Sequence, residues 1–283
     1  MGVTDCHVHI NPFWEMRPDA LALVGHRDAT TARYARDPRA FLEYLDRAGV
    51  ERAVLVNYVA PEVIGYTETA NTFASDYARA DPARLLATGG IRPDHPDPAN
   101  EVRHLVRDLG LRALKLHPPH QLFRPNAYVD GSLAGLAELY GACEREGLPV
   151  IFHTGTSVFP RARNKYGDPM FLEDVALDFP RLTIVLAHGG RPIWMPTAVF
   201  LARRFPNVWL EVSSVPPPRL LEYFPALEKL GPKVLFGTDW PGPAVPEIRP
   251  NLDAFRALPL SAEVQRLVLE ENPRKVFPPH GAR

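Results

Sequence analysis

The sequence lacks the features that mark disulfide-rich, nucleic-acid-binding or membrane proteins. Its 283 residues include only two cysteines, which do not make a disulfide framework, so a reducing cytoplasm is the expected compartment. The formal net charge is −1, which excludes the strong positive balance of a nucleic-acid-binding protein. No apolar run approaches the ~20 residues that span a bilayer, and no basic segment followed by an apolar one indicates a cleaved leader. We therefore expect neither a nucleic-acid nor a membrane partner.

Potential metal ligands stand near the first residue. The stretch VTDCHVHI, residues 3–10, is rich in β-branched apolar residues and predicts a strand. Because side chains alternate along a strand, His7 and His9 point to the same face. Two imidazoles on one face suit a single cation, which would offset the cost of burying them. A chance pair at the surface is the alternative at this point.

Short β-branched runs alternate with amphipathic stretches along the whole chain. Residues 38–49 and 133–147 have apolar residues at helical spacing and end in glycine, which predicts helices. The expected strands are 3–10, 52–58, 84–91, 111–117, 148–155, 182–190, 207–214 and 233–240. Nearly continuous apolar strands that alternate with helices form parallel sheets, and eight such units close into a barrel. We expect an α/β protein, a (β/α)8 TIM barrel, with one domain over residues 1–283.

An open, doubly wound sheet is the alternative fold. It normally has a glycine-rich phosphate-binding turn after its first strand, and HINPF, residues 9–13, is not such a turn. One long loop, residues 11–37, separates the first expected strand from the first expected helix. Long loops in compact domains are usually functional, so we expect this one to lie over the barrel mouth as a lid.

Polar residues gather at the ends of the expected strands. They are His7 and His9 on the first strand, Lys115 and His117 on the fourth, His153 on the fifth, His188 on the sixth and Asp239 on the eighth. Barrel enzymes place their active sites at the carboxyl ends of the strands. Histidines scattered over a surface would not favour that end in so many strands, so the pattern predicts an active site.

The ordered set of motifs resembles the amidohydrolase superfamily. HVH, KLH, FHTG, LAHGG and FGTDWP follow one another on the expected strands, and LPVIFHTG, FPRLTIVLAHGG and LVLEENPRKVF are close to its amidohydrolase-2 branch. That branch includes the aminocarboxymuconate-semialdehyde decarboxylase-like enzymes. The resemblance covers most of the chain and implies a metal-dependent enzyme on a TIM barrel.

The resemblance assigns His7, His9, His153 and Asp239 as ligands of one divalent ion. Zinc is the expected ion because it takes imidazole and carboxylate ligands and leaves a position for water when it is catalytic. Asp239 would also accept the proton of that water, and His188 is the second expected catalytic group. From the residues alone, Asp239 can instead cap a turn and His188 can be a core histidine.

Lys115 has two interpretations. In two-metal amidohydrolases a lysine on the fourth strand is carboxylated and bridges the ions, whereas in single-metal members of the branch it can bind the substrate as a cation. We favour one metal and a substrate-binding Lys115, with His117 facing the same cavity. Asp5 is expected to orient a ligand histidine from behind, because carboxylates often do so at zinc sites, or to be a weak ligand itself.

The expected substrate is a small molecule, with a carboxylate group as one option. Arg191 directly follows HGG and is expected to hold such a group through bidentate contacts. Trp14, with Phe159 and Trp240, is expected to frame an apolar or aromatic part of the substrate, and simple packing of these side chains is the alternative. The sequence leaves open whether the protein forms a homo-oligomer.

Hydrolysis is the favoured reaction, with water activated by the metal attacking an amide, ester or lactone carbonyl. The alternative is a non-oxidative, metal-dependent decarboxylase of an aromatic or enoic carboxylic acid. The preference rests on chain length, because decarboxylases of the branch usually carry extra helical insertions and this chain is compact. A third hypothesis is a barrel that keeps the motifs and serves only in binding or structure.

Overall fold

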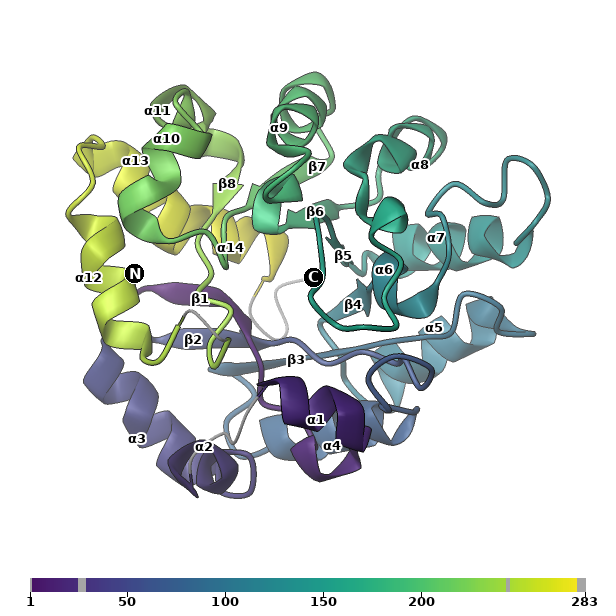
Figure 1. The fold of residues 1–283 in the computed structure, drawn as a ribbon, viewed down its shortest axis with the longest axis horizontal. Coiled ribbons are helices and arrows are strands. Elements are labelled where there is room, and N and C mark those ends of the chain that lie inside the picture. The colour runs from purple at the N-terminus through teal and green to yellow at the C-terminus, as the bar shows by residue number, and fades with distance from the viewer. Residues whose placement is uncertain (1, 25–28, 243–244, 279–283) are drawn as a thin grey trace.

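The computed structural model describes residues 2–24, 29–242 and 245–278, and its eight parallel strands lie in one sheet in the order β1 to β8. The strands are β1 (Thr4–Val8), β2 (Arg52–Leu55), β3 (Leu85–Gly89), β4 (Ala113–Leu116), β5 (Val150–His153), β6 (Ile184–Ala187), β7 (Val208–Glu211) and β8 (Val234–Leu235). Helices alternate with them and form the outer layer (Figure 1). The prediction of a single-domain (β/α)8 TIM barrel is confirmed.

The helices differ widely in length. They are α1 (Pro18–Val24), α2 (Ala29–Tyr34), α3 (Pro38–Ala48), α4 (Thr69–Ala78), α5 (Pro98–Arg107), α6 (Pro118–Gln121), α7 (Gly135–Glu146), α8 (Leu172–Asp178), α9 (Met195–Arg204), α10 (Leu220–Tyr223), α11 (Leu227–Leu230), α12 (Ile248–Arg256), α13 (Ala262–Arg266) and α14 (Asn272–Val276). Short 3₁₀ turns cover Phe13–Glu15, Asn164–Gly167, Pro169–Phe171, His188–Gly190, Pro217–Arg219 and Gly231–Lys233, and a π-helical turn covers Leu267–Glu271.

Helix α3 illustrates how the sequence sets the helix boundaries. The side chain of Asp37 accepts hydrogen bonds from the backbone N–H groups of Arg39 and Ala40, which caps the first turn. Gly49 ends the helix with φ at 76°, a left-handed conformation that glycine adopts without strain. The expected boundaries, 38–49, were therefore correct to within one residue.

The interior of the barrel is packed beneath the site. Ala113 and Ile151 precede Lys115 and His153 by two residues, so each pair lies on the same inward face of its strand. Ala113 and Ile151 belong to a buried apolar cluster that includes Phe277. Ala113 and Ile151 lie nearer the amino ends of their strands than Lys115 and His153, so apolar packing lies beneath these polar residues.

Strand β1 and the chain after β8 close the barrel. Asp239 N donates to His7 O at 2.8 Å, and His9 N donates to Trp240 O at 2.7 Å. The carboxylate of Asp5 lies across this seam and accepts from Thr238 N at 2.9 Å, Thr238 Oγ1 at 2.7 Å and His7 N at 3.1 Å. Burial raises the pKa of Asp5 to about 7, although these three donors act in the opposite direction.

The segment of residues 11–37 is more ordered than a plain loop. It contains a 3₁₀ turn, Phe13–Glu15, and the helices α1 and α2 (Figure 1). Ala20 of α1 and Ala70 of α4 belong to one buried apolar cluster. His26 and Arg27 lie outside the described residues. The side chains of Met16, Leu23 and Val24 line the cavity at the barrel mouth, as a lid would require. Its movement as a lid stays a prediction.

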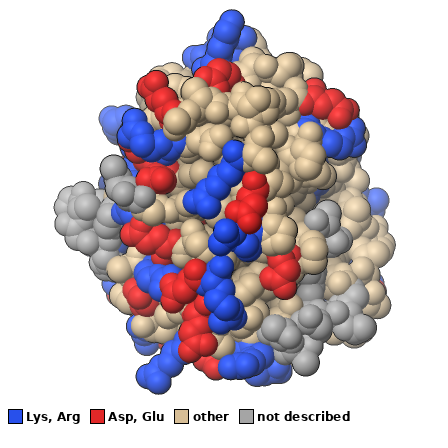
Figure 2. All heavy atoms as spheres, turned by 90° about the vertical axis from the view of Figure 1, so that its left-hand side faces the viewer, with Lys and Arg blue, Asp and Glu red and all other residues tan. Residues whose placement is uncertain are grey.

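The surface carries charges of both signs side by side. On the face that includes α12, basic and acidic side chains alternate (Figure 2), and Arg249 pairs with Asp253 at 2.7 Å within that helix. Such pairs on an exposed face are typical of a solvated surface. In the described part of the chain, no helix has both the length and the apolar character needed to cross a membrane.

The seam predicts a stability effect for Thr238→Val. Valine keeps the shape of threonine but leaves Asp5 Oδ2 without its donor and Trp240 N without the Thr238 Oγ1 acceptor. We expect the free energy of unfolding of the metal-free protein to fall by about 2 kcal/mol, the usual cost of unpaired buried polar groups. Denaturant unfolding followed by circular dichroism measures it. Thr72→Val, at an exposed position of α4, is the control, and an equal effect of both variants would contradict the role of the seam.

Candidate metal centre and active site

A cavity of about 500 Å³ opens at the carboxyl ends of the strands. Its polar lining includes His7, His9, Tyr58, Lys115, His117, His120, His153, Ser157, His188, Arg191 and Asp239. Its apolar lining includes Phe13, Met16, Ile64, Tyr66, Phe159, Met195, Val215 and Tyr223. The residues predicted from the strand ends therefore share one cavity with apolar and aromatic walls, the setting in which small ligands usually bind.

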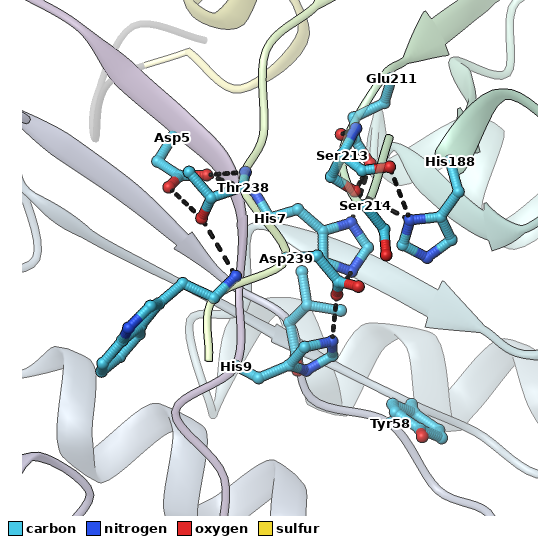
Figure 3. A network of polar contacts seen from close by, with 12 residues as sticks. Asp5, His7, His9, Tyr58, His188, Glu211, Ser213, Ser214, Thr238 and Asp239 are labelled. Atoms are coloured by element: carbon cyan, nitrogen blue, oxygen red, sulfur yellow. Dashed lines mark hydrogen bonds and ion pairs between the residues drawn. The ribbon is translucent and has the colours of Figure 1, made fainter. Parts of the chain in front are cut away.

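His7, His9 and Asp239 converge on one point. Nε2 of His9 and Nε2 of His7 lie 3.1 and 3.6 Å from Asp239 Oδ1, and the three potential ligand atoms lie within 4.8 Å of one another (Figure 3). Nδ1 of His9 lies 3.0 Å from Val56 O, which only accepts, so Nδ1 carries a proton, and in the neutral ring Nε2 carries the lone pair. Nε2 of the fully buried His7 has no hydrogen-bond partner among the described residues.

This arrangement fits a divalent cation. Two imidazole lone pairs and a carboxylate oxygen repel one another unless a positive charge lies between them, and the same donors are preferred by zinc and related ions. The pKa of Asp239 lies well below its usual range: burial raises it, whereas positive charge on the surrounding histidines, His188 foremost, lowers it by more. When these rings are neutral, a bound cation would supply that charge and favour the ionised carboxylate that a metal ligand must have.

His153, the fourth expected ligand, lies at the end of β5 on the cavity wall. Its buried Nε2 atom has no hydrogen-bond partner among the described residues, and its ring centre is 4.8 Å from that of His188. Burial lowers its pKa well below the usual value, so the ring is neutral and able to bind a metal. His153 is not in the close group formed by His7, His9 and Asp239, so its role as a ligand stays a prediction.

Glu211 supports His7 from behind. Its Oε2 atom accepts from His7 Nδ1 at 2.9 Å, with both side chains buried. This contact was expected of Asp5, whose carboxylate instead binds the backbone of His7 and the side chain of Thr238. Glu211 ends β7, and its place at a strand end was the signal in the sequence that could have identified it.

His188 lies next to this pair, at the start of the turn after β6. Its ring centre is 4.7 Å from that of His7, and its Nδ1 atom lies 2.8 Å from Ser213 Oγ. Burial, and then the positive charge of Arg191, lower the pKa of His188 well below its ordinary value. The ring is therefore neutral at pH 7 and lines the cavity, where it can accept a proton.

Two cationic side chains reach the same cavity. Lys115 is buried, and its Nζ atom has no hydrogen-bond partner within the described chain; burial lowers its pKa to about 8. Arg191 donates to Ser214 Oγ at 2.8 Å and lies 3.9 Å from Asp239 Oδ2. Both residues line the cavity, and their role in binding a substrate anion stays a prediction.

Next to His117 lies a group of contacting side chains that the sequence did not predict. Its ring stacks on His153 at 3.8 Å and on His120 at 3.5 Å between centres. His120 lies 3.1 Å from the hydroxyl of Tyr58 and 2.7 Å from Ser157 Oγ. Tyr58 is the last residue of the expected strand 52–58, and this position was its signal in the sequence. Ser157 lies beyond the expected strand 148–155, so the sequence held no signal for it.

Trp14 does not reach the cavity. Its side chain is 51% exposed and packs edge-on against Phe73 at 5.6 Å, and it is not among the lining residues. In the same 3₁₀ turn, Phe13 faces the cavity instead. The expectation that Trp14 frames the substrate was wrong, because a short turn directs neighbouring side chains to different sides.

Comparison with known proteins gives the family. A family model described as Amidohydrolase (Amidohydro_2) matches residues 4–278. The chain belongs to the amidohydrolase-2 family. No curated protein sequence matches it.

Several solved structures share the fold of this amidohydrolase. An uncharacterized TIM-barrel protein from Bordetella bronchiseptica is 24% identical, with a TM-score of 0.75 over 98% of both chains. The 5-carboxyvanillate decarboxylase of Sphingomonas paucimobilis is 19% identical, with a TM-score of 0.66 over 98% of both chains. A dihydroxybenzoic acid decarboxylase from Polaromonas sp. JS666, solved with manganese and 2-nitroresorcinol, is 16% identical, with a TM-score of 0.62 over 98% of this chain and 96% of that one.

Metal analysis of the purified amidohydrolase tests the centre. We expect about one divalent ion per chain by mass spectrometry, and its loss in His7→Ala and Asp239→Ala, because each variant removes one of three converging ligands. The control is His104→Ala, an exposed histidine paired with Asp108 on the surface. Two ions per chain in the wild type would contradict the single-metal arrangement and favour a carboxylated Lys115.

Proposed function

We propose that this amidohydrolase is a metal-dependent, non-oxidative decarboxylase that acts on an aromatic carboxylic acid. The observation that carries the proposal is the buried Lys115 ammonium, unpaired among the described residues, in a cavity with aromatic walls. A buried cation is costly without an anionic partner. A carboxylate substrate supplies that partner, whereas a neutral amide, ester or lactone does not.

The relatives support this reading over hydrolysis. The preference for a hydrolase rested on the compact chain, but the match to 5-carboxyvanillate decarboxylase spans 98% of both chains, so compactness does not separate the two classes. The Polaromonas decarboxylase contains manganese, which makes manganese an alternative to zinc here. Family and fold also identify an enzyme, which removes the hypothesis of a purely structural barrel.

The residues divide into three roles. His7, His9 and Asp239, with His153 as the fourth ligand, would hold the divalent ion. When bound, the ion would act as a Lewis acid toward an oxygen of the substrate. Arg191 and Lys115 would pair with the substrate carboxylate or a second anionic group, and the apolar walls would exclude water from it.

Decarboxylation needs a proton at the carbon that loses carbon dioxide. The bond between the ring carbon and the carboxyl carbon breaks, the electron pair stays on the ring carbon, and that carbon takes a proton as carbon dioxide leaves. Among the titratable groups on the cavity wall, His188 and Asp239 would hold and return this proton. The neutral His188 is suited to accept a proton when the substrate binds and to return it to the carbon.

Release of carbon dioxide tests the reaction. We expect protein loaded with zinc or manganese to release carbon dioxide from one or more hydroxylated benzoic acids. His188→Asn should keep the metal and lose about 100-fold or more in kcat, the usual loss of a general acid or base. Carbon dioxide capture and product chromatography measure both. Hydrolysis of lactones or esters without release of carbon dioxide would contradict the proposed decarboxylase and favour a hydrolase.

Substitution of Lys115 tests the binding of the carboxylate. We expect Lys115→Met to raise KM about 10-fold or more, because a charge-assisted contact contributes roughly 1.5–3 kcal/mol. Steady-state kinetics with the best carboxylate substrate measures this, and Lys229→Met, exposed on α11, is the control. An unchanged KM, or loss of a metal ion in Lys115→Met, would contradict the substrate-binding role.

A further inference from the structure

Four buried side chains form a continuous hydrogen-bonded path behind the cavity. His7 Nδ1 lies 2.9 Å from Glu211 Oε2, and Ser213 Oγ lies 2.9 Å from the same oxygen. Ser213 Oγ also lies 2.8 Å from His188 Nδ1. Figure 3 shows Glu211 and Ser213 on one side of His7 and Asp239 on the other. The path therefore joins a predicted metal ligand to the predicted proton-transfer group.

The chemistry of the groups sets the direction of each hydrogen bond. An ionised carboxylate only accepts, so His7 Nδ1 and Ser213 Oγ both donate to Glu211, and Ser213 N donates to its other oxygen at 2.5 Å. Ser213 has one hydroxyl proton, and Glu211 receives it. The contact between Ser213 and His188 must therefore use a proton on His188 Nδ1. The backbone oxygen of Ser213, 3.3 Å from the same nitrogen, also only accepts.

We propose that Glu211 is a positioning residue that sets the tautomers of two histidines, His7 directly and His188 through Ser213. Both neutral rings then carry their proton on Nδ1 and present a lone pair at Nε2. For His7 this lone pair faces Asp239, where a cation would bind. His188 itself lines the cavity. The assignment of the tautomers depends on the hydrogen bonds alone. Only its consequence for turnover rests on the proposed decarboxylase activity.

A second cation site is the competing interpretation of the same atoms. His7, His188 and Glu211 can bring one ligand atom each within 4.8 Å of one another. However, the Nδ1 atoms of both rings are already engaged in hydrogen bonds of 2.8 and 2.9 Å to Ser213 and Glu211. A cation bound through these Nδ1 atoms would have to displace both contacts. The hydrogen-bonded path satisfies these atoms without it.

Histidine NMR on the wild type tests the tautomers directly. Long-range proton–nitrogen spectra of metal-free protein labelled with nitrogen-15 in histidine, recorded at pH 8, distinguish a proton on Nδ1 from one on Nε2. His7→Gln and His188→Gln assign the two signals. We expect the Nδ1–H tautomer for both rings. An Nε2–H signal at either ring in the wild type overturns the proposal, and this result does not depend on how any variant folds.

Two variants separate the two halves of the path. In Glu211→Gln, the amide oxygen keeps the Ser213 N–H, so the amide nitrogen faces His7 and Ser213 and donates to both. We expect both histidines to change to the Nε2–H tautomer. In Ser213→Ala, His7 should stay unchanged, while His188 keeps only the 3.3 Å contact and becomes a mixture. Glu222→Gln, which removes a surface partner of Arg219, should change neither ring. Unchanged tautomers in folded Glu211→Gln overturn the proposal.

Zinc affinity and kinetics then distinguish the effect of Glu211 on metal binding from the effect of Ser213 on turnover. Glu211→Gln should weaken zinc binding about 10- to 100-fold, the usual effect of losing the group that orients a ligand histidine. Ser213→Ala should keep zinc affinity within about 3-fold and lower kcat about 10-fold or more with little change in KM. If the wild type binds a second zinc ion and Glu211→Gln does not, the proposal is overturned in favour of a cation site. If no carboxylic acid is decarboxylated, the proposed function fails, while the spectra and zinc affinities still decide the tautomers.

Discussion

Closure of the barrel between β1 and the chain after β8 is the constraint on which the site depends. The metal ligands predicted at the two ends of the chain, His7 and Asp239, are 232 positions apart, and the seam places them side by side through a backbone hydrogen bond of 2.8 Å. Because β8 has only two residues, regular strand pairing is short here. The carboxylate of Asp5, which binds Thr238 through two atoms, compensates for the missing pairs. Fold and chemistry are thus coupled at one position.

The strand ends were predictable because they follow from local patterns. Alternation along residues 3–10 put His7 and His9 on one face, and the carboxyl ends of parallel strands meet at one rim in any such barrel. These two rules place the predicted polar residues without knowledge of a single distance. His153 and His188 reached the same cavity for the same reason. The resemblance to a family added the assignment of ligands, which the pattern alone left open.

The partners of these residues were not predictable from the sequence. Two carboxylates, Asp5 and Glu211, could each have supported His7, and the sequence favoured the nearer one along the chain. The register between β1 and β2 shifts between Asp5 and Val8, which changes the neighbours of each side chain. A shift of this kind has no sequence signature, since it depends on how both neighbouring strands pack. The expectation for Trp14 was wrong for a related reason, because the orientation of a short turn depends on tertiary contacts.

The cavity retains buried polar atoms that the rest of the described interior could not satisfy. Nε2 of His7, Nε2 of His153, Nδ1 of His117 and Nζ of Lys115 are buried without partners among the described residues, and all four side chains line the same cavity. Each unpaired buried group costs about 1–3 kcal/mol. The two kinds of group need opposite partners, because an imidazole lone pair needs a cation or a hydrogen-bond donor, whereas an ammonium group needs an anion or a hydrogen-bond acceptor. A metal ion together with a carboxylate substrate meets both needs at once, whereas either partner alone leaves one set unpaired.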